Sequence, residues 1–135
     1  MASTIAFCPS PPLLVPELAA GAAGELDPLR AADRLQLVDG DMTLLPGLQL
    51  RHTPGHTPGH QVVLLHTRDE TLALTGDLLV HAAQLFDPAV TYLFDDDPDA
   101  AKATRIALLD ELRGGAAVLA TAHPTEPFHP LPATR

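Results

Sequence analysis

The stretch Arg51–His60 constrains the fold of this chain more than any other part of the sequence. It reads R-H-T-P-G-H-T-P-G-H, so three histidines stand four residues apart with two Pro-Gly pairs between them. That spacing would place the histidines on one face of a helix, but proline removes a backbone donor and clashes with the preceding turn. We therefore expect two tight turns, with Pro at the first corner and Gly able to take positive φ at the next.

Length and composition indicate one small globular domain. The 135 residues are 46% hydrophobic and 19% charged, as in ordinary globular proteins. A net charge of −9 with eight Lys and Arg argues against nucleic acid or an anionic membrane as a partner, because both require clustered positive charge. Cys8 is the single cysteine, so no internal disulfide can form, and the proline-broken N-terminal stretch resembles neither a signal peptide nor a membrane span. These features predict a cytoplasmic protein.

The apolar pattern changes character at about residue 32. Residues 1–32 are Pro-rich and then Ala/Gly-rich, which predicts an N-terminal arm of unrelated character with at most a short helix. Residues 33–135 form the expected domain. Alternation in Leu35–Val38 and Leu48–Leu50 predicts hairpin strands.

The second half of the chain alternates apolar runs with one strong helix signal. The runs Gln61–Leu65 and Thr71–Thr75 predict strands covered on both faces, and residues 81–96 are expected to be irregular with a short helical turn. Asp97 as N-cap, Pro98 at the first position and Gly114-Gly115 as the stop predict a helix. Its apolar stripe should lie across a sheet. We expect a buried strand at 116–121, His123 just beyond it, and a loop from Pro124 onward.

The side chains that could carry chemistry are His56, His60, Asp77 and His123, with His52 and His81 in reserve. Imidazole and carboxylate groups at strand ends are what a transition-metal site needs. The sequence has no H-E-x-x-H, no Gly-rich phosphate loop and no G-x-S-x-G elbow. The run Asp95–Asp97 suggests calcium, but a helix N-terminus that favours negative charge accounts for it more simply.

These motifs carry a family resemblance. T-P-G-H-T-P-G-H at 53–60, L-T-G-D at 74–77 and His123 after a terminal strand resemble the C-terminal half of the metallo-β-lactamase-fold hydrolases, over about residues 33–130. The resemblance implies an α/β fold that is half of an αββα sandwich, with a mixed β-sheet and a covering helix. It also implies a binuclear metal site at the edge between two sheets.

The resemblance assigns a role to each candidate residue. His56 would bind the first metal, Asp77 would bridge both metals, and His123 would bind the second, while His60 would support the site. His56 and Asp77 would then be catalytic, with zinc as the implied metal and iron or manganese as alternatives. Metal-bound hydroxide would hydrolyse an ester, thioester, lactone or amide of a small-molecule substrate. The alternatives are a turn histidine, a strand-end aspartate bonded to backbone, and a loop histidine at 123.

The departure from the family is equally informative. The H-x-H-x-D-H motif, which supplies four further ligands in the family, is not found in this sequence, so three of the seven implied ligands remain. Catalytic zinc normally has three protein ligands and a water. Two hypotheses follow. The chain is a metallohydrolase whose site and bare sheet face are completed in a homo-oligomer or by a second chain, or it is a non-catalytic truncated remnant or fusion product that at most binds metal weakly or oligomerises.

Overall fold

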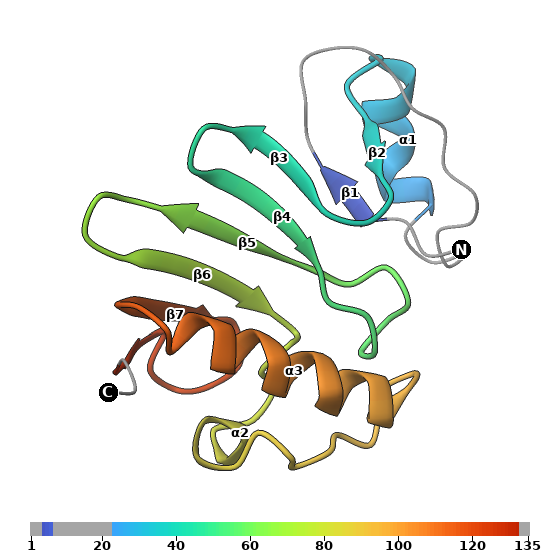
Figure 1. Cartoon of the computed structure of the whole chain (residues 1–135). Helices are drawn as coiled ribbons and strands as arrows, with labels where there is room; N and C mark the ends of the chain where they lie inside the picture. Colours follow the sequence, from blue (N-terminus) through green and yellow to red (C-terminus); the bar gives the residue numbers. More distant parts are fainter. Residues whose placement is uncertain (1–3, 7–22, 133–135) are drawn as a thin grey trace.

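The structure is a computed structural model that describes residues 4–6 and 23–132. Its main element is a six-stranded mixed sheet in the order β3-β4-β5-β6-β7-β8, with α3 lying along one face (Figure 1). Every neighbouring pair in this sheet is antiparallel except β6 and β7, which are parallel. The strands are β3 (Met42–Leu45), β4 (Leu48–His52), β5 (Gln61–His66), β6 (Thr71–Gly76), β7 (Ala117–Thr121) and β8 (Phe128–Leu131).

A smaller unit precedes this sheet. β1 (Thr4–Ala6) pairs antiparallel with β2 (Gln36–Val38), and α1 (Ala23–Ala31) is the short helix expected there. The expected strands at 35–38 and 48–50 are present, and the hairpin across the Pro46-Gly47 turn is formed by β3 and β4, whereas β2 pairs with β1 rather than forming a hairpin with β3. Most of the expected N-terminal arm, with Cys8, lies outside the described residues, and its boundary at residue 32 stays a prediction.

The helix signal is confirmed. α3 spans Pro98–Leu112, and the side chain of its N-cap Asp97 accepts a hydrogen bond from the Ala100 N–H. Its buried stripe is the one that the sequence indicates, and it packs on one face of the sheet. The resulting core comprises Val62, Leu64, Ala73, Leu78, Leu79, Leu108, Leu109, Leu112, Ala117 and Leu119. The irregular segment before α3 contains the expected short helical turn, α2 (Ala83–Phe86).

The end of the chain differs from expectation. Residues 128–131 form the edge strand β8 rather than a loop, paired antiparallel with β7. Pro130 hid this strand, because proline lacks the N–H that an interior strand needs. At an edge that donor has no neighbour to serve, so proline is tolerated there.

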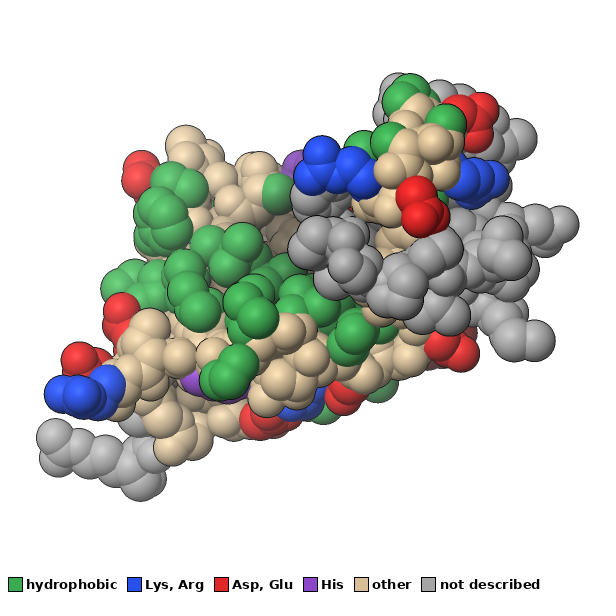
Figure 2. All heavy atoms as spheres, turned by 90° about the horizontal axis from the view of Figure 1, so that it is seen from above, with side chains coloured by type: hydrophobic (Ala, Val, Ile, Leu, Met, Phe, Trp, Pro, Cys, Tyr) green, Lys and Arg blue, Asp and Glu red, His purple; other side chains and the backbone are tan. Residues whose placement is uncertain are grey.

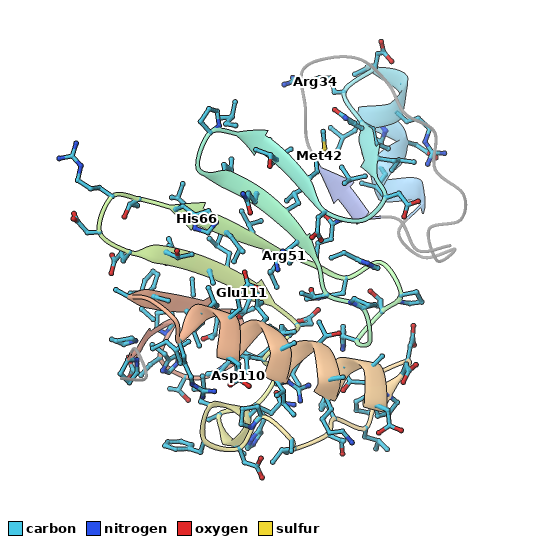
Figure 3. The ribbon with its side chains drawn as sticks, viewed as in Figure 1. Arg34, Met42, Arg51, His66, Asp110 and Glu111 are labelled. Atoms are coloured by element: carbon cyan, nitrogen blue, oxygen red, sulfur yellow. The ribbon has the colours of Figure 1, made fainter. Side chains whose placement is uncertain are left out.

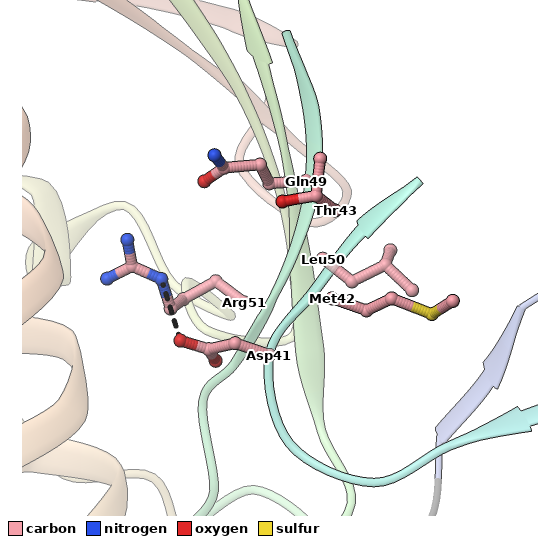
Figure 4. A pocket seen from close by; sticks show the side chains of 6 residues that line it. All are labelled: Asp41, Met42, Thr43, Gln49, Leu50 and Arg51. Carbon is pink, nitrogen blue, oxygen red and sulfur yellow. Dashed lines mark ion pairs between the residues drawn. The ribbon is translucent and has the colours of Figure 1, made fainter. Parts of the chain in front are cut away.

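The two faces of the sheet are covered unequally. In Figure 4, Arg51 and Gln49 point to the α3 side of β4, whereas Leu50 and Met42 point to the opposite side. On the α3 side, Arg51 forms a two-pronged ion pair with Glu111 at 2.8 and 3.0 Å (Figure 3). This pair ties the helix to β4.

Two apolar rows run across the other face, because residues opposite each other on neighbouring strands share a face. One row is Leu48, Leu65, Leu72, Val118 and Pro130, and the other is Leu50, Val63, Leu74, Ala120 and Phe128. We call these ten residues the open face. Val38 packs on Leu50 at one end, but Leu65, Leu74 and Phe128 are 39%, 43% and 61% exposed. Figure 2 shows hydrophobic side chains gathered over this surface.

The expectation that β5 and β6 are covered on both faces is therefore wrong for the described residues. Their near-continuous apolar sequence indicates an interior sheet. Figure 1 shows α2 and α3 on one side of the sheet and α1 beside β2 on the other, and Leu65 and Leu74 remain exposed. Within residues 4–6 and 23–132, no helix has the length and apolarity required to cross a membrane.

Candidate functional site

The candidate site lies at one edge of the sheet, where two neighbouring strands end. Asp77 directly follows β6 and His123 comes two residues after β7. These strands are parallel, so their carboxyl ends meet at the same edge. His56 reaches this edge from the loop between β4 and β5.

Asp77 is the centre of the arrangement, because its two carboxylate oxygens face two different histidines. Oδ2 lies 3.4 Å from Nε2 of His56, and Oδ1 lies 2.6 Å from Nε2 of His123. The structure thus brings together three residues that are well separated in sequence. Their roles as metal ligands stay predictions.

His60 contributes differently, because both of its ring nitrogens are engaged by protein groups. Its Nε2 accepts a hydrogen bond from the Asp77 backbone N–H at 3.0 Å. The proton must then sit on Nδ1, which lies 2.7 Å from the Thr53 hydroxyl and 3.2 Å from the Thr53 carbonyl. Burial lowers the pKa of His60, which is consistent with a neutral ring. This geometry fits support of Asp77 rather than metal ligation.

The turns that carry His56 are fixed against the start of α3. The Asp97 N–H donates to the Gly55 carbonyl at 2.9 Å, and the Asp96 N–H donates to the His56 carbonyl at 3.2 Å. Gly55 has φ of +137°, and a Cβ there would lie 2.1 Å from the backbone nitrogen of Ala101. Glycine is therefore required for the loop to contact the helix. Of the two expected tight turns, the second is confirmed, because the His60 N–H donates to the Thr57 carbonyl across Pro58 and Gly59. The first is a bend in which the Gly55 N–H donates to the same carbonyl, and positive φ occurs at Gly55 but not at Gly59.

Asp95, which contacts the Nδ1 side of the His56 ring, carries no local sequence signal for this role. Oδ1 of Asp95 lies 3.0 Å from Nδ1 of His56, and the Asp95 side chain is 1% exposed. Asp97 alone of the run 95–97 caps α3, and the Asp95 side chain instead contacts His56. Contact between residues 39 positions apart leaves no local pattern in a single sequence.

Three of the four remaining histidines take part in local hydrogen bonds away from Asp77, whereas His129 lies on β8 and its buried Nε2 has no hydrogen-bond partner among the described residues. His52 Nε2 lies 2.9 Å from the Pro58 carbonyl, and His81 Nδ1 accepts from the Ala83 N–H at 3.0 Å. His66 Nδ1 lies 2.9 Å from the Thr71 hydroxyl. None of the three is recorded within bonding distance of the Asp77 carboxylate.

The donor distances fit part of a metal site. Two ligands held about 2.1 Å from zinc at a tetrahedral angle lie about 3.4 Å apart, which matches the 3.4 Å between His56 Nε2 and Asp77 Oδ2. The 2.6 Å contact of His123 with Asp77 is a direct hydrogen bond and would have to lengthen. Among the residues that the structure describes, no group of three or more His, Cys, Asp or Glu is arranged to hold a metal. The described residues therefore fit one edge of a coordination shell rather than a complete one.

Comparison with known proteins accounts for this combination of fold and site. A sequence model of the metallo-beta-lactamase superfamily matches residues 10–123. The chain belongs to this superfamily. Its mixed sheet and covering helices are half of the metallo-β-lactamase-like αββα sandwich, and the resemblance drawn from the T-P-G-H and T-G-D motifs is confirmed.

The relatives of this superfamily member include lactonases. An N-acyl homoserine lactonase of Bacillus cereus is 46% identical over 63 residues, which is 46% of this chain and 25% of the relative. A second, from a Bacillus species, is 56% identical over 32 residues, 24% of this chain and 13% of the relative. Hydrolase ancestry is therefore shown at the level of the superfamily.

Solved structures agree. An N-acyl homoserine lactone hydrolase, with the product N-hexanoyl-L-homoserine at its catalytic metal centre, has a TM-score of 0.56 and 29% identity, covering 64% of this chain and 34% of that one. The dizinc quorum-quenching lactonase AidC has a TM-score of 0.53 and 26% identity, covering 73% and 37%. A metal is thus a property of the family. The present chain spans a quarter or less of the curated relatives above and about a third of these structures.

Proposed function

We propose that this chain supplies one side of a two-metal hydrolase site that acts on lactones or related esters. The observation that carries the proposal is the Asp77 carboxylate, with one oxygen facing His56 Nε2 and the other facing His123 Nε2. A carboxylate placed in this way is suited to bridge two metals, with one imidazole on each. We assign zinc as the metal, because a dizinc lactonase is among the structural relatives and imidazole with carboxylate suits zinc.

The chemistry follows from that arrangement. Bound metals would acidify a water to hydroxide and polarise the substrate carbonyl. The chain's own residues hold the donors in place: His60 fixes the Asp77 backbone, and the turns on α3 fix His56. Lactone is the favoured substrate class because related proteins are N-acyl homoserine lactonases. The lone Cys8 supports a cytoplasmic location.

The proposed site needs ligands beyond His56, Asp77 and His123, since catalytic zinc normally has three protein ligands and a water. We propose that they come from a further polypeptide layer, in a second copy or another chain, that packs on the open face. This face is apolar along both of its rows, and sheets pack face to face through such surfaces. The layer would lie on the sheet whose edge carries the site.

A non-catalytic half-domain is the second candidate, and the incomplete ligand group among the described residues favours it. Metal content and oligomeric state separate the two. We expect the purified chain to bind close to one or more equivalents of zinc, iron or manganese and to sediment as an oligomer or complex. A monomer with well under one equivalent of metal would leave only the non-catalytic candidate.

Substitutions test the assigned ligands. We expect Asp77→Ala and His56→Ala each to lower zinc affinity sharply, because each removes a donor from the same edge of the coordination shell. His66→Ala is the matched control, since His66 is exposed and its Nδ1 lies 2.9 Å from the Thr71 hydroxyl at the far end of β5. Zinc titration against a chromophoric chelator measures the affinities. Equal losses in all three variants would show that the metal is adventitious.

A further inference from the structure

Asp95 is a buried carboxylate directly behind His56. Its side chain is 1% exposed, and its Oδ1 lies 3.0 Å from His56 Nδ1. Its other oxygen, Oδ2, is buried and has no hydrogen-bond partner among the described residues. Burying a carboxylate is costly unless it is paired or hydrogen-bonded. The placement of Asp95 therefore requires a compensating group.

Arg105 supplies the compensating charge. Its side chain is also 1% exposed, and its Nη2 lies 3.9 Å from Asp95 Oδ2. Nε donates to the Leu78 carbonyl at 2.7 Å, and Nη1 donates to the Pro88 and Val90 carbonyls, both at 2.9 Å. Burial lowers the pKa of Arg105 and the Asp95 carboxylate opposes that effect. The guanidinium is thus anchored by three carbonyls of the segment after β6 and faces Asp95.

The His56 ring is held from several sides. Tyr92 stacks on it with ring centroids 6.3 Å apart and planes inclined by 30°, and His60 meets it edge-on at 6.2 Å. An ionised carboxylate only accepts hydrogen bonds, so the proton in the contact with Asp95 belongs to His56 Nδ1. Nε2 is then the nitrogen that faces Asp77 at 3.4 Å.

We propose that Asp95 is a positioning residue that keeps the His56 proton on Nδ1 and directs Nε2 to the site beside Asp77, and that Arg105 holds Asp95 in place. This inference rests on the proposed function, because it assigns Nε2 the part of a metal donor. The hydrogen bond made by one ring nitrogen fixes the tautomer and orientation in which the other binds metal. Arg105 of α3 and Asp95 of the segment between β6 and α3 thereby both act on the orientation of the His56 ring.

The tautomer of His56 tests the inference in the metal-free chain. Nitrogen-15 shifts of its ring are measured above about pH 8.5, two units over the ordinary histidine pKa. We expect the proton on Nδ1 in the wild type and in Asp95→Asn, whose amide oxygen still accepts, and a shift toward Nε2–H in Asp95→Ala. Asp96→Ala, an adjacent exposed carboxylate removed, should match the wild type. A wild-type His56 protonated on Nε2 would overturn the inference without any variant, even where Asp95→Ala fails to fold.

Zinc affinity provides the second measurement. We expect Asp95→Ala to bind zinc about 10- to 100-fold more weakly, as is typical when the partner of a metal-bound histidine is removed. Asp95→Asn should lose less, and Asp96→Ala should lose nothing. Equal affinity of Asp95→Ala and Asp96→Ala would overturn the inference while leaving the proposed function intact. A wild-type chain that binds no zinc would refute the proposed function instead, and the tautomer would still decide the role of Asp95.

Discussion

The histidines of the site differ in which ring nitrogen is already engaged. His60 uses both nitrogens for protein contacts, whereas His56 uses Nδ1 and presents Nε2 to Asp77. The T-P-G-H-T-P-G-H motif treats the two histidines alike, so residue type and spacing alone do not separate their roles. The family resemblance implies His56 as a ligand and His60 as support, which fits the observed ring contacts. It does not indicate Asp95, because this carboxylate belongs to a segment outside the motif.

His60→Ala should destabilise the fold. Removing the ring leaves the Asp77 N–H and the Thr53 groups without their partner, and an unsatisfied buried donor costs about 1–3 kcal/mol. His66→Ala, at an exposed ring, should change the free energy of unfolding by less than about 0.5 kcal/mol. Urea denaturation of both variants measures the difference, and a His60→Ala chain as stable as His66→Ala would contradict this role.

The contribution of His60 should also depend on pH. Burial lowers its folded-state pKa below the ordinary 6.5, so the unfolded chain takes up the proton first as pH falls. The stabilising effect of His60 is therefore fully present above pH 6.5 and declines as pH falls from there through the folded-state pKa. We expect the stability difference between wild type and His60→Ala to be larger near pH 7.5 than near pH 5. A difference that grows on acidification would contradict the neutral ring.

At the scale of elements, the site depends on the close contact between the histidine turns and α3. Gly55→Ala should cost more than about 1 kcal/mol and displace His56, because a Cβ would overlap the Ala101 backbone. Gly40→Ala is the matched control, since Gly40 also has positive φ, +77°, but no atom within 4 Å of a Cβ. Thermal unfolding and zinc affinity of the two variants separate steric overlap from backbone strain. Equal effects would mean that backbone strain alone matters.

Elements with complete local signals were predictable, and the others were not. The start of α3 is marked in the sequence by Asp97 and Pro98 and its end by Gly114. The strands β5, β6 and β7 are marked by apolar runs. β3 and β8 have four residues each, too few for a clear sequence pattern, and they form strands because they pair with β4 and β7. The β1–β2 pairing was missed for the same reason, because strand partners far apart in sequence leave no periodicity.

On the scale of the whole molecule, α3 covers one face of the sheet, whereas the described residues cover the open face only at the end where Val38 packs on Leu50. A contiguous apolar surface of this kind marks an interaction site or an aggregation hazard. The apolar runs of β5 and β6 predict strands that are buried on both faces. Strands of that kind fit a complete αββα sandwich better than the described residues of this chain, in which one face is partly exposed. The open face is thus the surface on which the proposed second layer would pack.

The double variant Leu65→Gln/Leu74→Gln should weaken association of the chain. Burying a fully exposed leucine stabilises by about 1.5–3 kcal/mol, and Leu65 and Leu74 are 39% and 43% exposed. Losing both contacts should therefore shift the association constant by about 10-fold or more. Leu93→Gln/Ile106→Gln removes two exposed apolar side chains away from the open face and is the control. Sedimentation equilibrium over a range of concentrations measures both. Unchanged association of the first variant would exclude the open face as the interface.

The parallel pairing of β6 with β7 has a consequence for how quickly the site can form. The antiparallel neighbours β3–β4 and β5–β6 are hairpins with short loops, whereas β6 and β7 meet only after the segment with α2 and α3 has closed back on the sheet. Contacts between residues distant in sequence form slowly. Asp77 and His123 are 46 residues apart, so we expect them to meet after the β5–β6 hairpin that positions Asp77 has formed. A nascent chain would thus have its carboxylate in place before the second imidazole arrives.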